Sequence, residues 1–411
     1  MKVGEFDLND PGLLLRDDVL DKPYAFYDVL RREAPVWQIP GQDTFLISDP
    51  ALIKEAVGRF DEFSSNIVSL LHNDGSGCPV AFRISSYRDP IQVFATADPP
   101  DHTRHRKLVQ PHLSPAAVAD LEPVVQEIVD RSLEAVLAVR RCDIVSTFSD
   151  PVPAQTVCAL LGLPDEDANQ VIRFTFATGA LLDGVTDIEG MTTAATGALE
   201  LGIYVHTKFE EVLALAPEDR RGLLGVFAGM FEAGDVTMSE VTSMLTVFVT
   251  AGSETTASLM ATAIETLARD QALQDRLRRD PSLIPDAIEM FLRDNGPFQF
   301  HYRYVPADTS IGGVSIPAES RVMLMWAAAN RPSPDTPAHD EEPRLSPHFA
   351  FGRGLHFCIG APVARMETRV ALERLLGTTT SFRLDPDEPM TRRPSIFIRR
   401  HGKLPLILET V

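Results

Sequence analysis

Apolar residues recur at helical spacing along most of this chain, and short β-rich segments interrupt them only rarely. Helices are predicted at residues 23–32, 50–57, 123–139, 153–161 and 195–214; all but the last begin at or next to a proline, which is favoured in a first helical turn. Strands are predicted at residues 36–38, 44–47, 309–316 and 404–408. Helices and strands do not alternate regularly, as a parallel sheet would require. The pattern predicts one domain over residues 1–411, mainly α with small β-sheets.

Two segments, residues 66–98 and 330–350, fit neither pattern because they are rich in Pro, Gly, Asp and Ser. Loops of this length inside a compact domain tend to be functional. Both segments are therefore expected to lie near a binding site.

The longest predicted helix begins at a capping box, Thr237 to Glu240, and continues without proline to Arg269. A helix of about 32 residues at about 1.5 Å each is roughly 48 Å long, enough to cross the whole domain. Residues 251–256, Ala-Gly-Ser-Glu-Thr-Thr, lie inside it and lower its helix propensity. Taken alone, this segment is either a tolerated polar kink or a functional site.

Composition and charge restrict the class of protein. Apolar residues make up 44% of the chain, the net charge is −20, and no run of 18 apolar residues or basic-then-apolar leader occurs. The four cysteines show no disulfide or metal-site spacing, which fits a reducing compartment. A cytoplasmic protein without a membrane anchor is expected. The acidic balance argues against nucleic acid or anionic membrane as a partner.

The most informative segment is the loop at residues 351–360, Phe-Gly-Arg-Gly-Leu-His-Phe-Cys-Ile-Gly. Cys358 directly precedes a helix that is predicted to begin at Ala361-Pro362 and to end at Gly377, in the left-handed conformation common at helix ends. Free N–H groups at a helix N-terminus favour a thiolate. Cys358 is therefore a candidate metal ligand.

The spacing of Phe351, Gly354, Cys358 and Gly360 resembles the F-x-x-G-x-x-x-C-x-G haem-binding loop of the cytochrome P450 family, in its bacterial form. The resemblance implies a triangular-prism fold with a long central helix over haem b. It also implies that the Cys358 thiolate binds the haem iron, which favours O–O cleavage. Residues 66–98 and 330–350 would then be the B–C loop over the substrate and the meander before the haem loop.

Residues 251–256 resemble the A-G-x-E-T-T motif of the P450 central helix. By this resemblance Ala251 and Gly252 would border the haem, and Gly252 would open a groove for dioxygen. Glu254 and Thr255 would be the acid–alcohol pair that supplies two protons during catalysis.

Residues that would hold the haem propionates are also implied by the resemblance. His102 and Arg106 lie one turn apart on a predicted helix and match the family's H-x-x-x-R. Arg303 and His356 match two further propionate ligands, and arginine suits bidentate binding of carboxylates.

One family motif is altered. The E-x-x-R of the K-helix would need Glu at position 290, where this chain has Met290, while Glu289 lies about 100° away around the helix. Arg293 would be costly to bury without a carboxylate, so it is expected to bond to meander carbonyls, to Glu289 through a distorted turn, or to water. Arg344 alone resembles the meander arginine that usually joins this pair.

The expected activity is that of a haem-thiolate monooxygenase that takes electrons from NAD(P)H through a ferredoxin reductase and a ferredoxin. Two alternatives are a haem-binding sensor or ligand carrier without turnover and a peroxide-driven oxidase. An acidic ferredoxin would need a basic patch, for which Arg104, Lys107, Arg353 and Arg365 are candidates. The substrate is expected to be hydrophobic or aromatic. The expected pocket segments are residues 66–87, 174–182, 247–251, 298–300 and 397–398, in particular Val247, Phe298, Phe300, Phe397 and Ile398.

Overall fold

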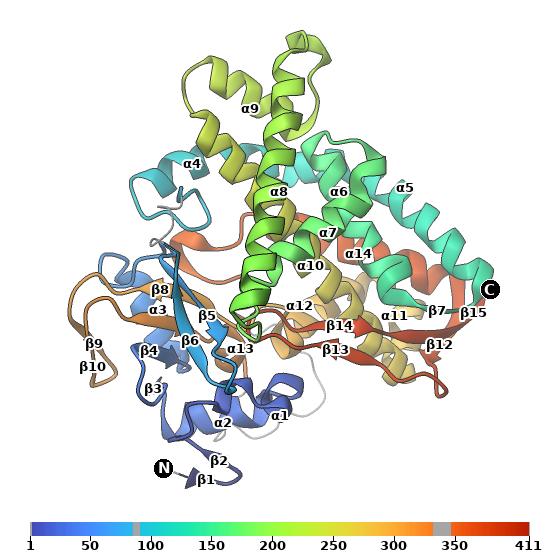
Figure 1. The fold of residues 1–411 in the computed structure, drawn as a ribbon. Helices are drawn as coiled ribbons and strands as arrows, with labels where there is room; N and C mark the ends of the chain where they lie inside the picture. Colours follow the sequence, from blue (N-terminus) through green and yellow to red (C-terminus); the bar gives the residue numbers. More distant parts are fainter. Residues whose placement is uncertain (1, 85–90, 332–346, 411) are drawn as a thin grey trace.

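The computed structural model describes residues 2–84, 91–331 and 347–410. Helices make up most of the fold, and they surround one long central helix (Figure 1). The helices are α1 (Asp17–Asp21), α2 (Tyr24–Glu33), α3 (Pro50–Gly58), α4 (Asp101–Val109), α5 (Pro115–Val139), α6 (Pro151–Leu161), α7 (Ala168–Gly179), α8 (Ile188–Leu213), α9 (Gly222–Glu232), α10 (Met238–Arg269), α11 (Gln271–Arg279), α12 (Ile284–Asn295), α13 (Trp326–Ala329) and α14 (Ala361–Thr378).

The strands are short and gather mainly at the N-terminal side and around the C-terminus (Figure 1). They are β1 (Lys2–Val3), β2 (Phe6–Asp7), β3 (Val36–Gln38), β4 (Thr44–Ile47), β5 (Ser69–Asn73), β6 (Pro79–Arg83), β7 (Arg141–Asp143), β8 (His301–Tyr304), β9 (Thr309–Ile311), β10 (Val314–Ile316), β11 (Arg321–Leu324), β12 (Thr379–Leu384), β13 (Thr391–Arg393), β14 (Arg400–Lys403) and β15 (Pro405–Thr410). The largest sheet has the order β3-β4-β11-β8, in which only β4 and β11 are parallel. The prediction of a mainly α fold with small sheets is confirmed.

Two predicted helices begin earlier than expected, because their capping residues lie upstream. The N-cap of α5 is Ser114, whose hydroxyl accepts from the N–H of Ala117, and Pro123 lies inside the helix rather than at its start. The N-cap of α8 is Asp187, whose carboxylate accepts from the N–H of Gly190 at 2.9 Å.

Three further expectations need correction. Residues 309–316 form a hairpin, β9 and β10, because Gly312 and Gly313 adopt positive φ angles of 56° and 78° between them. Residues 66–98 contain the β5–β6 hairpin, and residues 85–90 lie outside the described part of the chain. Gly377 is not among the described glycines with positive φ, and α14 continues through it to Thr378.

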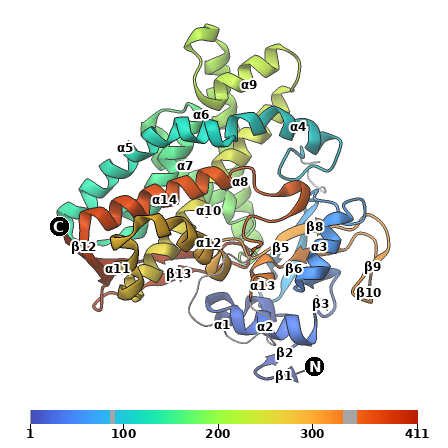
Figure 2. The same cartoon turned by 180° about the vertical axis from the view of Figure 1, so that it is seen from behind.

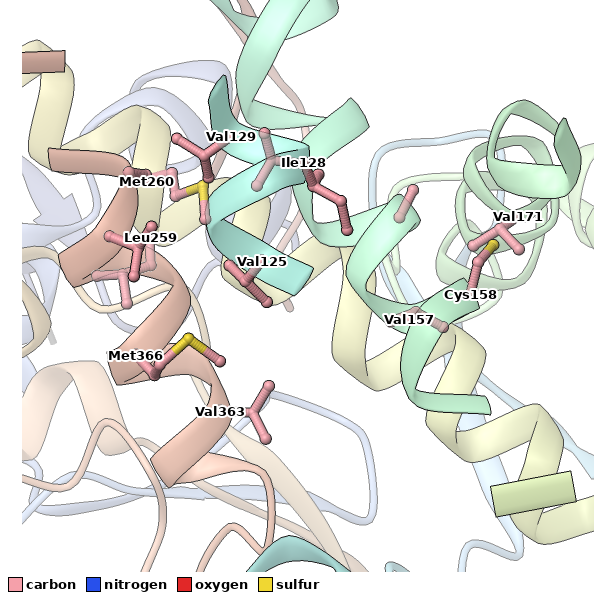
Figure 3. Close-up of a cluster of buried hydrophobic side chains, with 14 of the residues drawn as sticks. Val125, Ile128, Val129, Val157, Cys158, Val171, Leu259, Met260, Val363 and Met366 are labelled. Atoms are coloured by element: carbon pink, nitrogen blue, oxygen red, sulfur yellow. The ribbon is translucent and has the colours of Figure 1, made fainter. Parts of the chain in front are cut away.

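The central helix α10 has the predicted capping box, in which Thr237 and Glu240 satisfy each other's backbone N–H groups. It contacts α6, α7, α8, α12 and α14, so it is covered along most of its length. From behind, α14 runs beside α5 and α12 (Figure 2). Figure 3 shows the core that joins these helices, where Val125 and Val129 of α5 meet Met260 of α10 and Met366 of α14. This packing fixes the start of α14, and with it Cys358, relative to the middle of α10.

Among the described residues, no helix combines the length and the apolar character needed to cross a membrane.

Candidate active site

Backbone geometry holds Cys358 in a tight loop in front of α14. Gly352 and Gly354 adopt positive φ angles of 68° and 73°, a conformation that side-chain-bearing residues rarely adopt. The N–H of Cys358 donates to the carbonyl of Phe351 at 2.9 Å, which closes the loop. Gly360 is the N-cap of α14, and Pro362 occupies its first turn.

Two opposing effects act on the Cys358 thiol. Burial raises its pKa, while the N–H of Gly360, the charge of Arg106 and the N–H of Ala361 each lower it. In this environment the free thiol is protonated at neutral pH, and bonding to a metal ion would remove the proton outright. The helix start therefore favours the thiolate, as predicted from the sequence, but burial outweighs it until a metal is bound.

A cavity lies between the Cys358 loop and the middle of α10. It encloses about 1440 Å³ including its open mouth. Of the site residues predicted from the sequence, it is lined by Arg106, Val247, Ala251, Gly252, Thr255, Phe298, Arg303, Phe351, His356, Cys358 and Gly360. The structure thus brings segments from four distant parts of the sequence to one cavity.

The α10 wall of the cavity is formed by residues 251–256. A Cβ at Gly252 would lie 3.0 Å from Cγ2 of Val157, so glycine lets α6 pack closely against α10 here. The Thr255 hydroxyl donates to the carbonyl of Ala251 at 2.7 Å, one turn back along the helix. Its oxygen still has free lone pairs on the cavity side, and a small rotation would release its proton.

Glu254 points away from the cavity lining and is buried in a charged cluster. Its Oε1 accepts from Arg400 Nη1 at 3.0 Å, and Arg400 Nη2 also donates to both carboxylate oxygens of Asp150 at 3.0 and 3.1 Å. A Cβ at Gly179, the last residue of α7, would lie only 2.6 Å from Glu254 Oε2. Burial raises the pKa of Glu254, and the Arg400 charge opposes that shift. The sequence analysis identified Glu254 but not Arg400, which lies 146 residues further along the chain.

Buried nitrogen atoms cluster at one edge of the cavity. Both ring nitrogens of His102 and Nδ1 of His356 are buried without a hydrogen-bond partner among the described residues, and the two rings lie 4.3 Å apart. Arg303 is 7% exposed, and its described hydrogen bond goes to the Tyr302 carbonyl rather than to a carboxylate. Burial lowers the pKa of Arg303 to about 10 and that of His356 to about 3. Such a concentration of unsatisfied donors calls for an anionic partner.

Comparisons with known proteins agree with this geometry. The cytochrome P450 family model matches residues 210–403. The chain is 32% identical over 409 residues to cytochrome P450 144 of Mycobacterium tuberculosis, covering 97% of this chain and 92% of the relative. The chain belongs to the cytochrome P450 family. It is also 30% identical to the P450 monooxygenase PikC of Streptomyces venezuelae, covering 97% of this chain and 93% of PikC. Among solved structures, this P450 resembles CalO2 (TM-score 0.82, 26% identity, 99% and 100% of the two chains covered) and CYP164A2 of Mycobacterium smegmatis (TM-score 0.83, 27% identity, 96% and 98%).

The protein is therefore a P450 monooxygenase, and its cofactor is haem b. The residues of the cavity fit that group. The unpartnered nitrogens of His102 and His356 and the buried charge of Arg303 match the two propionates in sign and number. Arg106, whose Nη1 donates to the Phe357 carbonyl at 2.9 Å, adds a second guanidinium at the same edge.

The altered K-helix motif is compensated by two carboxylates. Arg293 donates to Oδ1 and Oδ2 of the next residue, Asp294, at 2.7 and 3.2 Å, a partner that the sequence analysis did not consider. Glu289 instead accepts from Arg365 of α14 at 2.6 and 2.8 Å and contacts His348 at 3.0 Å. Met290 packs at the edge of the main core. Arg344 and residues 332–346 of the meander lie outside the described residues.

The expected substrate residues divide into two groups. Val247 and Phe298 line the cavity, whereas Phe300, Phe397 and Ile398 do not. These three are buried behind Phe298 in the core next to the sheet, since the Phe397 ring packs 5.0 Å from the Phe298 ring and Ile398 pairs with the Phe298 backbone. Residues 66–84 and 174–182 are also absent from the described lining.

A functional candidate that the sequence analysis missed is Glu367, in the third turn of α14. It lines the cavity, is 2% exposed, and is held near Thr156 and Thr256. Burial raises its pKa to about 8, while those two hydroxyls oppose the shift. A position nine residues after Cys358, in a helix that begins beside it, was the only signal available in the sequence.

Proposed function

We propose that this P450 hydroxylates a largely apolar small molecule, with electrons from NAD(P)H that arrive through a ferredoxin reductase and a ferredoxin. One observation carries the proposal: a single cavity joins Cys358, the propionate-binding edge and the Thr255 hydroxyl to an apolar wall. Relatives of 30–31% identity include a vitamin D(3) 25-hydroxylase of Pseudonocardia autotrophica and a 6-deoxyerythronolide B hydroxylase of Saccharopolyspora erythraea, whose named reactions support hydroxylation as the reaction type.

The substrate class follows from the cavity wall. Above Thr255 the lining is formed by aliphatic and aromatic side chains, among them Phe94, Leu113, Val247, Phe248 and Phe298. An apolar wall with few polar groups orients a ligand through shape and burial rather than through hydrogen bonds. A lipid, terpenoid, steroid, macrolide or aromatic skeleton would meet this requirement.

Haem, when bound, supplies the redox chemistry that activates dioxygen, while the protein supplies position and protons. Thr255 is the hydroxyl that faces the reacting region and can pass a proton on. Glu254 must leave Arg400 to reach it, because its carboxylate now lies in the cluster with Asp150. Glu367, with a pKa of about 8, is protonated at neutral pH and is a second proton store on the cavity wall.

The basic docking patch for ferredoxin is smaller than the sequence suggested. Arg104 forms an ion pair with Glu240, and Arg365 with Glu289, so much of their charge is neutralised. Lys107 and Arg353 are exposed and form no ion pair with a carboxylate among the described residues. These two residues, beside the Cys358 loop, are the proposed contacts for an acidic ferredoxin.

The test is substrate-dependent NADH oxidation by the haem-loaded protein with a surrogate ferredoxin and its reductase. We expect product to form with NADH and both partners, and Thr255→Ala to keep NADH oxidation while product falls at least about tenfold and hydrogen peroxide rises. Thr246→Ala, which removes a similarly back-bonded hydroxyl earlier in α10, is the matched control. Turnover with hydrogen peroxide alone and none with NADH would instead establish a peroxide-driven oxidase. Binding of ligand and carbon monoxide without any turnover would establish a carrier.

A further inference from the structure

Three arginines are buried among the described residues, and two of them have their charge accounted for. Arg400 is paired with Glu254 and Asp150, and Arg303 faces the haem propionates. The third, Arg321 at the start of β11, is 7% exposed, and no carboxylate oxygen of the described residues lies within 4.0 Å of it. Burial lowers the pKa of Arg321. A buried guanidinium without an anion is costly, so its surroundings require an explanation.

Arg321 lines a second cavity of about 310 Å³, which is separate from the haem cavity. This cavity lies where the β5–β6 hairpin covers the first residues of β4 and β11, which pair in parallel through Thr44 and Arg321 (Figure 1). The two cavities share no lining residue. A ligand here would therefore bind without competing for the haem site.

Two buried hydroxyls complete the polar floor of this cavity. Arg321 Nε and Nη2 donate to Ser69 Oγ at 3.1 and 2.6 Å, and Nη1 donates to Thr44 Oγ1 at 2.7 Å. Because each hydroxyl oxygen already accepts from the guanidinium, its own proton must point elsewhere. No acceptor for either proton is present among the described residues. The floor thus presents a buried positive charge and two oriented O–H donors.

The two carboxylates that line the cavity do not fill this position. Glu319 forms an ion pair with Arg83 at 2.7 Å, and both side chains are about 60% exposed (61% and 59%) at the mouth. Asp43 favours the charged form of Arg321 only through its field. The deep part of the cavity is therefore positive, and its rim is neutral overall.

We propose that this cavity is a binding site for a small organic carboxylate, which accepts hydrogen bonds from Ser69 and Thr44 above the Arg321 guanidinium. Two O–H donors over a planar cation match the two oxygens of a carboxylate. The cavity is large enough for an acid of a few carbon atoms beyond that group. Glu319 and Arg83 at the rim would select ligands whose remaining part is polar.

The test is isothermal titration calorimetry of the haem-loaded, full-length protein with sodium succinate, at constant ionic strength. Succinamide, which has the same shape without charge, and inorganic phosphate are the comparison ligands. We expect saturable heat with succinate and none with succinamide. We also expect the midpoint of thermal unfolding to rise by about 2–5 °C at saturating succinate. No heat with succinate, or heat with phosphate alone, would overturn the proposal.

Variants assign the heat to this cavity. Arg321→Met is expected to abolish binding, and Ser69→Ala and Thr44→Val are each expected to weaken it about three- to tenfold. Arg131→Met, which removes an exposed arginine elsewhere, is the matched control and should leave binding unchanged. If Arg321→Met does not fold, the two hydroxyl variants decide: unchanged affinity in both refutes the site. Since the readout involves no turnover, failure here is independent of the proposed monooxygenase activity.

Discussion

The ion pair between Glu289 and Arg365 makes a sharp prediction about the altered K-helix. Glu289 Oε1 and Oε2 accept from Arg365 at 2.6 and 2.8 Å, and His348 Nε2 lies 3.0 Å from Oε2. His348 Nδ1 accepts from the N–H of Ala350, so Nε2 carries the proton and donates to Glu289. Arg365 also lies 4.5 Å above the Phe351 ring. One carboxylate thus ties α12 to α14 and to both ends of the segment before the Cys358 loop.

The magnitude follows from the pKa of Glu289. Burial acts to raise it, but the hydrogen bonds from Arg365 and His348 hold it at about 2, below its ordinary value of 4.5. A carboxyl with a lowered pKa stabilises the fold above pH 4.5, and that contribution is lost as the pH falls from 4.5 towards 2. A shift of this size would correspond to about 3 kcal/mol. Because the side chains of Glu289 and Arg365 are 27% and 37% exposed, screening by water reduces this to about 1–2 kcal/mol.

The assay is urea unfolding of the haem-loaded protein, followed by the Soret band and by far-ultraviolet circular dichroism, at pH 7 and at pH 3.5. Glu289→Gln should lower the free energy of unfolding by about 1–2 kcal/mol at pH 7 and by less at pH 3.5. Asp286→Asn, an exposed position on the same helix, removes the same charge and should change little at either pH. Equal effects of the two variants, or an effect of Glu289→Gln that does not diminish in acid, would refute the role given to this pair.

Three further predictions concern the site itself. Cys358→Ser should remove the red-shifted Soret band of the ferrous–carbon monoxide difference spectrum, with unchanged far-ultraviolet circular dichroism; retention of that band would show that another group is the ligand. Glu367→Gln should flatten the pH dependence of stability between pH 4.5 and 8, measured by urea unfolding. In the wild type, the raised pKa of about 8 means that folding retains a proton that the unfolded chain has lost, so stability falls across that range as the pH rises. Gly179→Ala should displace the Glu254 carboxylate, because the new Cβ would lie 2.6 Å from its Oε2. It should cost about 1–3 kcal/mol of stability and change the ratio of product formed to NADH consumed.

Features set by neighbouring residues were predictable from the sequence. The central helix was located from its capping box, and the start of α14 from Ala361-Pro362. Strands β3 and β4 were predicted with their observed bounds. Errors arose where a second local signal competed with the first. Pro123 resembles a helix start, but Ser114 supplies the actual cap, and a proline inside a long helix is tolerated when the tertiary packing of that helix is extensive.

The arrangement of the site was predictable only in part, because the family motifs name residues but not their partners. Cys358, Thr255 and Arg303 do line one cavity, as the resemblance implied. The carboxylate beside Arg293 is supplied by Asp294, the next residue in the chain, which a search for Glu at a fixed helical spacing overlooks. The phenylalanines at positions 300 and 397 were assigned to the substrate pocket by their type, yet both face the core behind Phe298.

Buried charges show why tertiary structure had to decide the rest. Glu254, Glu367 and Arg321 are each at least 91% buried, yet their surroundings differ in kind. Glu254 is balanced by Arg400, Glu367 is neutralised by a raised pKa, and Arg321 has only hydroxyl partners among the described residues. Each solution depends on residues more than 100 positions away, so no local pattern encodes it. A buried charge with neither a partner nor a route to neutrality marks a place where a ligand completes the structure, and Arg303 beside the haem cavity is the example that makes Arg321 interpretable.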